Sequence, residues 1–473
     1  MKIFSRREFV LRTAQAGTFA SLFPKDAVVM LLGAADAAPP TAGAAGRAHL
    51  SDRDHVLLDE LEQATMKFFW EAASPYTGLV KDRSQADGPD ARDVASIAAT
   101  GFGLTALCIA ESRGYVAPKK VRERALATLR FLAKRLPNKN GFYFHFVNVH
   151  TGERVWESEG STIDPAILLC GVLTCRQHFD DAEIRRLATE IYERVDWPWM
   201  LAGGDLLSHG WKPESGFLKP RWDSYSELLM LYLLGLGSAT HPLPAETWHA
   251  WKRPLWNYEG LRFIGSPAPL CVHQYPHAWF DFRGKRDRYA DYFENSVIAT
   301  RVHRDWCIGL NKRFPHFGPD LWGITASDSA GGYVVWGGPP PLGPLDGTLV
   351  PCAAGGSIPF LPEETLRVLR TMRERFGKKV FKRYGFIDAF NPQTGWFGPD
   401  AIGIDVGITM LMAENARTGF VWETFMKNPE AQRGMDRAGF KPAWLRRAQP
   451  TIRSWSYRTS SSTKPWGGNV RRI

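Results

Sequence analysis

The chain has 473 residues, of which 44% are hydrophobic and 23% are charged. This composition is typical of a folded globular protein with a sizeable core, and it excludes a disordered or fibrous chain. The net charge is +10, but seven basic residues and no acidic ones follow Trp444. The remainder is only mildly basic and has no nucleic-acid-binding module. We interpret the tail as a solvated segment, with contact to an anionic envelope surface as the alternative.

The N-terminal residues resemble an export signal. Ser5–Val10 reads SRREFV, the pattern of a twin-arginine signal, and Ala35–Ala37 is a candidate cleavage site. Pro24, Lys25 and Asp26 interrupt the apolar part, which is therefore too broken for a membrane span. The sequence predicts a signal over 1–37, a linker over 38–50 and a periplasmic or secreted protein.

Helical periodicity dominates the rest of the chain. The predicted helices cover 57–69, 94–112, 117–135, 162–178, 181–195, 223–237, 361–376 and 405–418, and the clearest strand pattern is Tyr143–Val149. Long loops with Gly, Pro and aromatic residues separate many of the helices. The pattern favours an all-α toroid or solenoid. We predict one domain over 51–440 and a basic tail over 441–473.

The six cysteines form neither a CxxC motif nor a Cys/His cluster with zinc spacing. Cys108 and Cys170 lie in apolar helical patterns, where a free cysteine behaves as a small hydrophobic residue. We expect mostly free thiols. The sequence also lacks a P-loop, a dinucleotide-binding fingerprint and a GxSxG motif.

Three clusters of carboxylates lie near the starts of predicted helices. The first is Glu157–Asp164, where Ser161 and Asp164 fit a helix cap but Glu159 does not. The second is RWDSYSE at 221–227, in which Asp223 and Glu227 stand four residues apart. Ser224 and Glu227 also fit a capping box, so a structural role for Glu227 stays open. Neighbouring like charges raise a carboxyl pKa, as a general acid requires.

The third cluster spans 384–407 and holds Asp388, Asp400 and Asp405 among Gly, Pro and aromatic residues. Asp405 directly precedes an apolar run and could be an N-cap residue. A glycosidase needs a second carboxylate beside its acid, and any of these three could supply it.

Other polar and aromatic residues are candidates for binding a carbohydrate. The chain has 18 Trp, and aromatic faces stack on sugar rings as well as filling cores. The full set of predicted substrate-binding residues is Asp82, Arg83, His145, Asp164, Trp211, Trp222, Asp223, Tyr225, His273, Gln274, Trp279, Asp388 and Asp400. Each aromatic residue has core packing as its alternative. His273, Gln274 and His277 resemble metal ligands, but no carboxylate has matching spacing, so no metal or other cofactor is expected.

Several long motifs, in order, resemble the glycoamylase-like domain family and within it the endo-β-1,2-glucanases of glycoside hydrolase family 144. They include FFWEAASPYTGLVKDRS, ESEGSTIDPAILLCG, GWKPESGF, RWDSYSELLMLYLLGLGSATHPLP, HQYPHAWFDFRG and IGIDVGITMLMAENARTG. The resemblance covers about residues 52–440. It implies an (α/α)6 toroid with long cleft-lining loops that hydrolyses β-1,2-linked glucan by inversion, without a metal.

The resemblance also implies roles for individual residues. Glu227 matches the general acid, Glu159 an acidic residue at the cleavage subsite, and Asp405 the general base, with Asp400 and Asp388 as alternatives. Val406 departs from the family loop, which has Gln there. We expect a monomer that binds β-1,2-glucan and no nucleic acid. The alternatives are a hydrolase or transglycosylase acting on another β-glucan, and a non-catalytic glucan-binding protein of the envelope.

Overall fold

The structure is a computed structural model that describes residues 50–266, 269–339 and 345–444. The predicted export signal, nearly all of the predicted linker and the tail beyond Trp444 lie outside these residues. None of the described helices is both long enough and apolar enough to cross a lipid bilayer.

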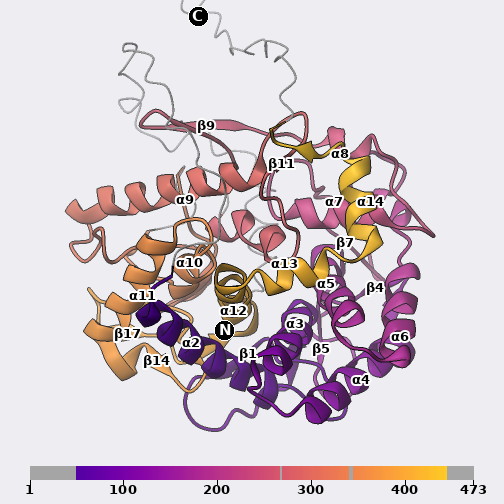
Figure 1. Cartoon of the computed structure of the whole chain (residues 1–473), viewed down its shortest axis with the longest axis horizontal. Helices are drawn as coiled ribbons and strands as arrows, with labels where there is room; N and C mark the ends of the chain where they lie inside the picture. The colour runs from indigo at the N-terminus through magenta and orange to yellow at the C-terminus, as the bar shows by residue number, and fades with distance from the viewer. Residues whose placement is uncertain (1–49, 267–268, 340–344, 445–473) are drawn as a thin grey trace, which may run out of the picture.

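The helices form a ring in which outer and inner helices alternate along the chain (Figure 1). The outer helices are α2 (Asp52–Glu71), α4 (Pro118–Lys134), α6 (Ala182–Glu193), α9 (Tyr292–Gly309) and α11 (Pro362–Phe376). The inner helices are α3 (Ile97–Arg113), α5 (Ile163–His178), α7 (Leu228–Gly237), α10 (Pro351–Gly355) and α12 (Gly403–Arg417). This alternation confirms the predicted all-α toroid.

The ring is less regular between α7 and α9. The 3-10 turns η3 (Leu270–His273) and η4 (Tyr275–Ala278) take the inner position, and the preceding helix α8 (Thr247–Ala250) has one turn. Helix α14 (Pro429–Arg437), from the C-terminal end, packs on α7. Helix α13 (Phe420–Phe425) contacts α3, α5 and α12. Short 3-10 turns complete the helical set: η2 (Pro198–Leu201), η5 (Leu310–Lys312) and η6 (Gly377–Lys379).

Periodicity explains which helices lie outside and which inside. In α6 the buried residues Ile184, Leu187, Ala188 and Ile191 follow the spacing of one helix face, and Asp181 caps the helix. In α3, by contrast, every residue from Ile97 to Ala110 is buried. A helix that is apolar on all sides must be surrounded by protein, and the inner positions of the ring provide that environment.

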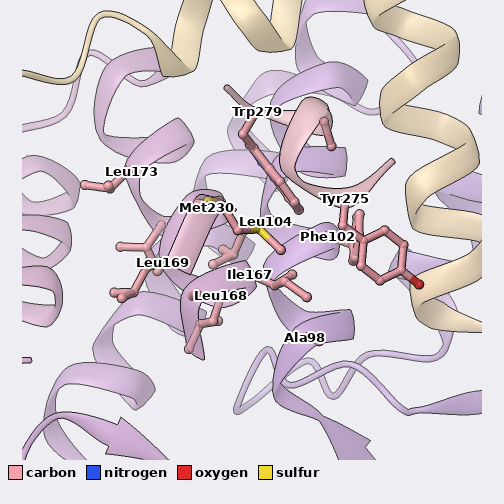
Figure 2. Close-up of a cluster of buried hydrophobic side chains, with 14 of the residues drawn as sticks. Ala98, Phe102, Leu104, Ile167, Leu168, Leu169, Leu173, Met230, Tyr275 and Trp279 are labelled. Atoms are coloured by element: carbon pink, nitrogen blue, oxygen red, sulfur yellow. The ribbon is translucent and has the colours of Figure 1, made fainter. Parts of the chain in front are cut away.

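Two glycines allow the inner helices α3 and α5 to approach closely. A Cβ atom added to Gly171 would lie 2.1 Å from the carbonyl oxygen of Gly101. Any larger residue at position 171 would therefore separate the two backbones. Around this contact lies the core shown in Figure 2, where Phe102, Leu169 and Trp279 pack together with Met230 of α7.

The strands are short and antiparallel, and they lie in the loops between helices. The pairs are β1 (Arg83–Gln85) with β18 (Asp400–Ile402), β2 (Val94–Ser96) with β5 (Phe146–Asn148), β3 (Asn138–Lys139) with β4 (Phe142–Tyr143), β9 (Leu255–Tyr258) with β10 (Leu261–Ile264), β11 (Lys285–Arg286) with β19 (Lys441–Pro442), β12 (Ser327–Ser329) with β13 (Gly332–Val334), β14 (Phe381–Lys382) with β15 (Gly385–Phe386), and β16 (Phe390–Asn391) with β17 (Trp396–Phe397). One sheet has three strands, β6 (Gly160–Ser161), β7 (Gly210–Lys212) and β8 (Gly216–Phe217).

Some predicted boundaries are wrong. The helix expected over 223–237 begins at Leu228, and the expected capping box does not form, because Glu227 is itself the N-cap residue and makes no side-chain cap bond. Asp405 is not an N-cap residue, since α12 begins two residues earlier at Gly403. The strand expected over 143–149 is divided between β4 and β5. Residues 441 and 442 of the predicted tail pair with β11.

Candidate active site

The predicted catalytic residues lie where the inner helices begin. Each inner helix follows an outer helix that returns the chain to the same end of the ring, so the inner helices are parallel and their N-termini share one end. Glu159 lies just before α5, Glu227 caps α7, and Asp405 lies in the first turn of α12. Helix N-termini favour negative charge, which suits a group of carboxylates at this end.

Glu159, Asp164 and His145 form one buried cluster. The backbone N–H of His145 donates to the carbonyl of Glu159 at 2.9 Å, which joins the two loops. Nδ1 of His145 lies 3.3 Å from Oε1 of Glu159, and Nε2 lies 3.3 Å from Oδ1 of Asp164. A neutral imidazole has one N–H and can donate to only one of these carboxylates. Through its two nitrogens the His145 ring lies between the two acids.

Ser161 orients Asp164. Its hydroxyl donates to the Asp164 carboxylate and accepts the Asp164 backbone N–H at 3.2 Å. Helix α5 nevertheless has Thr162 as its N-cap residue and no side-chain cap bond, so the predicted capping box does not form. Asp164 contacts both Ser161 and His145.

The same three side chains are the one group among the described residues that could hold a metal ion. Their candidate ligand atoms all lie within 4.8 Å of one another. A metal would need one ring nitrogen of His145 and both carboxylates on the same side. Here the two nitrogens face different carboxylates, an arrangement that fits a proton-bridged cluster better than a metal centre.

Two hydrogen bonds to the backbone of Tyr225 hold the segment that precedes Glu227. The Tyr225 N–H donates to the Lys252 carbonyl at 2.9 Å, and Ser266 Oγ donates to the Tyr225 carbonyl at 2.7 Å. Glu227 is half-buried. Asp223, predicted to face the same way, is exposed and pairs loosely with Lys252 at 3.8 Å. The predicted i, i+4 pair on one helix face is wrong, because the helix begins after both residues.

Asp405 lies beside Asp388, and both are buried. The two carboxyl groups are within hydrogen-bonding contact, and burial together with the charge of Asp405 raises the pKa of Asp388 well above its ordinary value. Oδ2 of Asp388 accepts the backbone N–H of Asp328 at 2.7 Å. The thiol of Cys352 donates to Oδ1 of Asp405 at 3.4 Å. Two acids in contact cannot both be ionised easily, so the pair holds a proton between them.

A network of two arginines and several acids borders this pair. Arg83 donates to Asp82 at 3.0 Å and to the two oxygens of Asp328 at 3.0 and 2.7 Å. Arg92 makes two 2.7 Å bonds to the carboxylate of Asp400. Asp400 is therefore occupied by an ion pair, which makes it a poorer candidate for a base than Asp405.

The sequence assigned no individual role to Asp328. Arg83 and Asp328 are 245 positions apart, and no local pattern joins them. Burial raises the pKa of Asp328, with Arg83 opposing the rise. The sequence signal for Asp328 as a site residue was its position in the polar and aromatic stretch that follows Trp322.

The predicted stacking tryptophans differ in position. Trp211 is half-buried, in β7 beside Gly160, and retains exposed surface. Trp222 is buried, donates to Thr162 Oγ1 at 2.7 Å and stacks on the His209 ring at 4.0 Å. Trp279 is fully buried in the core of Figure 2 and donates to Thr105 Oγ1 at 3.0 Å. The prediction that Trp279 contacts a sugar is wrong, because its ring is enclosed by protein.

Tyr225, which belongs to the RWDSYSE segment, is buried, and so are His273 and Gln274. Tyr225 Oη and His273 Nδ1 are 3.0 Å apart, and burial lowers the pKa of His273 to about 3. Gln274 is fully buried and donates to the Ala353 carbonyl at 2.9 Å and to Ser357 Oγ at 2.7 Å. The prediction that Gln274 binds substrate is wrong, since its amide group holds η4 to α10.

Fold and site together define a glucoamylase-like toroid whose buried carboxylates gather at one end. A family model described as putative glucoamylase matches residues 219–429. A solved putative glucoamylase from Bacteroides uniformis is 31% identical, with a TM-score of 0.78 over 84% of this chain and 100% of that one. The chain belongs to this glucoamylase-like family, as its motifs predicted.

Two further relatives have named activities. An endo-β-1,2-glucanase from Chitinophaga pinensis, solved with sophorotriose and glucose, is 29% identical, with a TM-score of 0.78 over 84% of this chain and 100% of that one. An exo-β-1,2-glucooligosaccharide sophorohydrolase from Parabacteroides distasonis is 26% identical over 424 residues, which are 81% of this chain. The present chain spans 58% of the length of that relative.

Proposed function

We propose that this protein is a glycoside hydrolase that cleaves β-1,2-linked glucan. The observation that carries the proposal is the set of buried carboxylates at the inner-helix starts, in a fold shared with a β-1,2-glucanase over 84% of the chain. Family membership alone would leave the chemistry open, because one fold hosts several activities. The acids placed at one end of the ring are the groups that hydrolysis of a glycosidic bond requires.

Two carboxyl groups carry the reaction in this proposal. Glu227 gives its proton to the leaving glycosidic oxygen as the bond from that oxygen to C1 breaks. Asp405 accepts a proton from a water molecule whose oxygen forms the new bond to C1. Attack from the side opposite the leaving group inverts the anomeric configuration. Asp405 suits the base role because Asp400 is bound by Arg92 and because the pKa of Asp388 is raised well above its ordinary value by burial and by the charge of Asp405.

The remaining polar groups at this end hold sugar hydroxyls. Glu159 and Asp164 accept hydrogen bonds from hydroxyls, and His145 keeps the two acids together. Asp82 and Arg83 extend the polar surface from β1. Trp211 offers a partly exposed ring for stacking.

Reducing-end release from purified linear β-1,2-glucan tests the activity. We expect release by the wild-type protein and a fall in kcat of about 10³-fold in Glu227→Gln. Asp223→Asn is the matched control, because this exposed acid lies four residues away and is expected to retain activity. Binding of the glucan without turnover by a folded wild-type protein would overturn the proposal in favour of a binding protein.

Stereochemistry and linkage are tested separately. Proton NMR of the first products distinguishes inversion from retention, and initial α-anomer from the β-linkage supports inversion. A panel of β-1,3-, β-1,4- and β-1,6-glucans tests specificity. Faster hydrolysis of any of these would contradict the proposed linkage without affecting the assignment as a glycosidase.

We propose in addition that the protein is exported through the twin-arginine route. The proposal is supported by the paired Arg6 and Arg7 and the candidate cleavage site at Ala35–Ala37. A reporter fused after residue 50 is expected in the periplasm, and Arg6→Lys combined with Arg7→Lys is expected to retain it in the cytoplasm. Export unchanged by the double substitution would contradict the route.

A further inference from the structure

Asp388 is a buried acid whose surroundings point to a role in aligning Asp405. The two residues line one pocket together with Cys352, Thr65 and Thr409, between α2, α10 and α12. Asp388 is 3% exposed and Asp405 is 4% exposed. The carboxyl group of Asp388 lies in contact with that of Asp405.

The contacts of Asp405 and those of Asp388 indicate which of the two acids holds the proton that they share. Asp405 is in the first turn of α12, where the helix N-terminus favours a negative charge, and it receives the Cys352 thiol. Asp388 has no helix terminus behind it, and the Asp328 N–H is the backbone donor that reaches its side chain. The proton therefore resides on Asp388, and its hydroxyl donates to ionised Asp405.

The other charged groups near Asp388 support the same assignment. Asp328 and Asp400 add negative charge, and the backbone N–H of Asp388 donates to the Asp400 carbonyl at 2.9 Å. Arg83 and Arg92 are directed to these neighbouring acids. Among the residues described here, α2 contributes Leu61 and Thr65 to this pocket, which bring no charge. No described cation forms an ion pair with Asp388 that would help it to ionise.

We propose that Asp388 is a positioning residue that remains protonated in the working enzyme and orients the carboxylate of Asp405 by donating a hydrogen bond to it. This inference rests on the proposed function, in which Asp405 is the general base. When Asp388 loses its proton at alkaline pH, two adjacent carboxylates repel and Asp405 moves out of line. Asp388 would thereby add its own ionisation to the alkaline limb of the pH–kcat profile, beside that of the proposed acid Glu227.

Two substitutions at position 388 separate hydrogen bonding from bulk. Asp388→Asn keeps the shape: its NH₂ can donate to Asp405 and its oxygen can accept the Asp328 N–H. Asp388→Leu has a similarly branched but larger side chain, which cannot donate a hydrogen bond. We expect Asp388→Asn to retain kcat within about fivefold and to have a less steep alkaline limb, because only the ionisation of Glu227 remains in it. We expect Asp388→Leu to lower kcat about 10²-fold with KM changed less than about threefold.

The outcomes that would overturn the inference are distinct. One is an Asp388→Asn protein as inactive as Asp388→Leu, another is an unchanged alkaline limb in Asp388→Asn, and a third is an Asp388→Leu protein with wild-type kcat. Should Asp388→Leu fail to fold, the infrared difference spectrum of wild type against Asp388→Asn still tests the proton. A protonated-carboxyl band at the pH of maximal activity supports the inference, and its absence overturns it.

Failure of the proposed function has a different signature. In that case the wild-type protein releases no reducing ends, or Asp405→Asn retains wild-type turnover. An active wild type with an inactive Asp405→Asn supports the base assignment, and the position-388 variants then test only the positioning role.

Discussion

Buried acids lie at both ends of the inner helices, but the side chains that they contact differ. At the C-terminal end, Glu414 of α12 pairs with Arg113 at 2.7 Å, and Glu62 of α2 pairs with Arg417 at 2.5 Å. At the N-terminal end, about 14 Å away along α12, Asp405 meets another acid. Both ends are buried, so burial alone does not distinguish them.

The difference lies in which partner each acid receives. A buried acid paired with arginine is held in place by that pair, and it contributes to structure. The pKa of a buried acid beside a second acid is raised, as that of Asp388 is beside Asp405, and its charge therefore responds to its surroundings. The comparison indicates that ion pairs hold the ring together at the C-terminal end, whereas the N-terminal end carries the acids to which we assign proton transfer.

The largest expected effect is on turnover at the N-terminal end. Asp405→Asn should lower kcat by about 10³-fold, because it removes the proposed base. The melting temperature should stay level or rise, since one of two repelling acids is gone. Reducing-end release and thermal unfolding measure the two effects. A kcat within tenfold of wild type would refute the division of roles.

The second effect is on stability at the C-terminal end. Arg417→Met should lower the free energy of unfolding by about 3–5 kcal/mol, because buried Glu62 loses its partner. The kcat of the folded variant should stay within about twofold of wild type. The matched control is Arg53→Met, whose pair with Glu374 is exposed and should be worth less than about 1 kcal/mol. Equal losses in the two variants would contradict the contrast between buried and exposed pairs.

A third prediction concerns pH and Glu62. Its pKa is raised to about 8 by burial and by the charge of Glu414, against the opposing arginines. The folded state thus binds a proton that the unfolded state releases near pH 4.5. The stabilisation is complete below about pH 4.5 and is lost as pH rises through about 8. Denaturant unfolding across this range should show a decline of a few kcal/mol in wild type and a flatter profile in Glu62→Gln. Parallel profiles would show that Glu62 is already ionised.

The smallest expected effect is that of metal removal. Incubation with EDTA should change kcat/KM by less than about twofold, because His145 already directs its two nitrogens to different carboxylates. Added zinc after dialysis is the reciprocal measurement. A large loss with EDTA that zinc restores would identify Glu159, Asp164 and His145 as a metal centre.

Local patterns predicted much of the fold and part of the site. Apolar periodicity located α3, α5, α6 and α11 to within a few residues, because the pattern of buried positions is a local property of the chain. Carboxylates that precede apolar runs indicated the candidate catalytic residues. The predicted start of α7 is too early, because residues 223–225 form an extended segment that is hydrogen-bonded to the backbone of Lys252. That contact is 27 positions away and leaves no local signal.

The sequence by itself determined the alternation of apolar and amphipathic helices, the family, and the carboxylates at the helix starts. Only the tertiary structure determined which side chains contact one another. It joined Arg83 to Asp328 across 245 positions, placed Asp388 against Asp405, and buried Trp279 in the core. The physical reason is that helix formation depends on neighbours along the chain, whereas the charge state of a carboxyl group depends on what ring closure brings beside it.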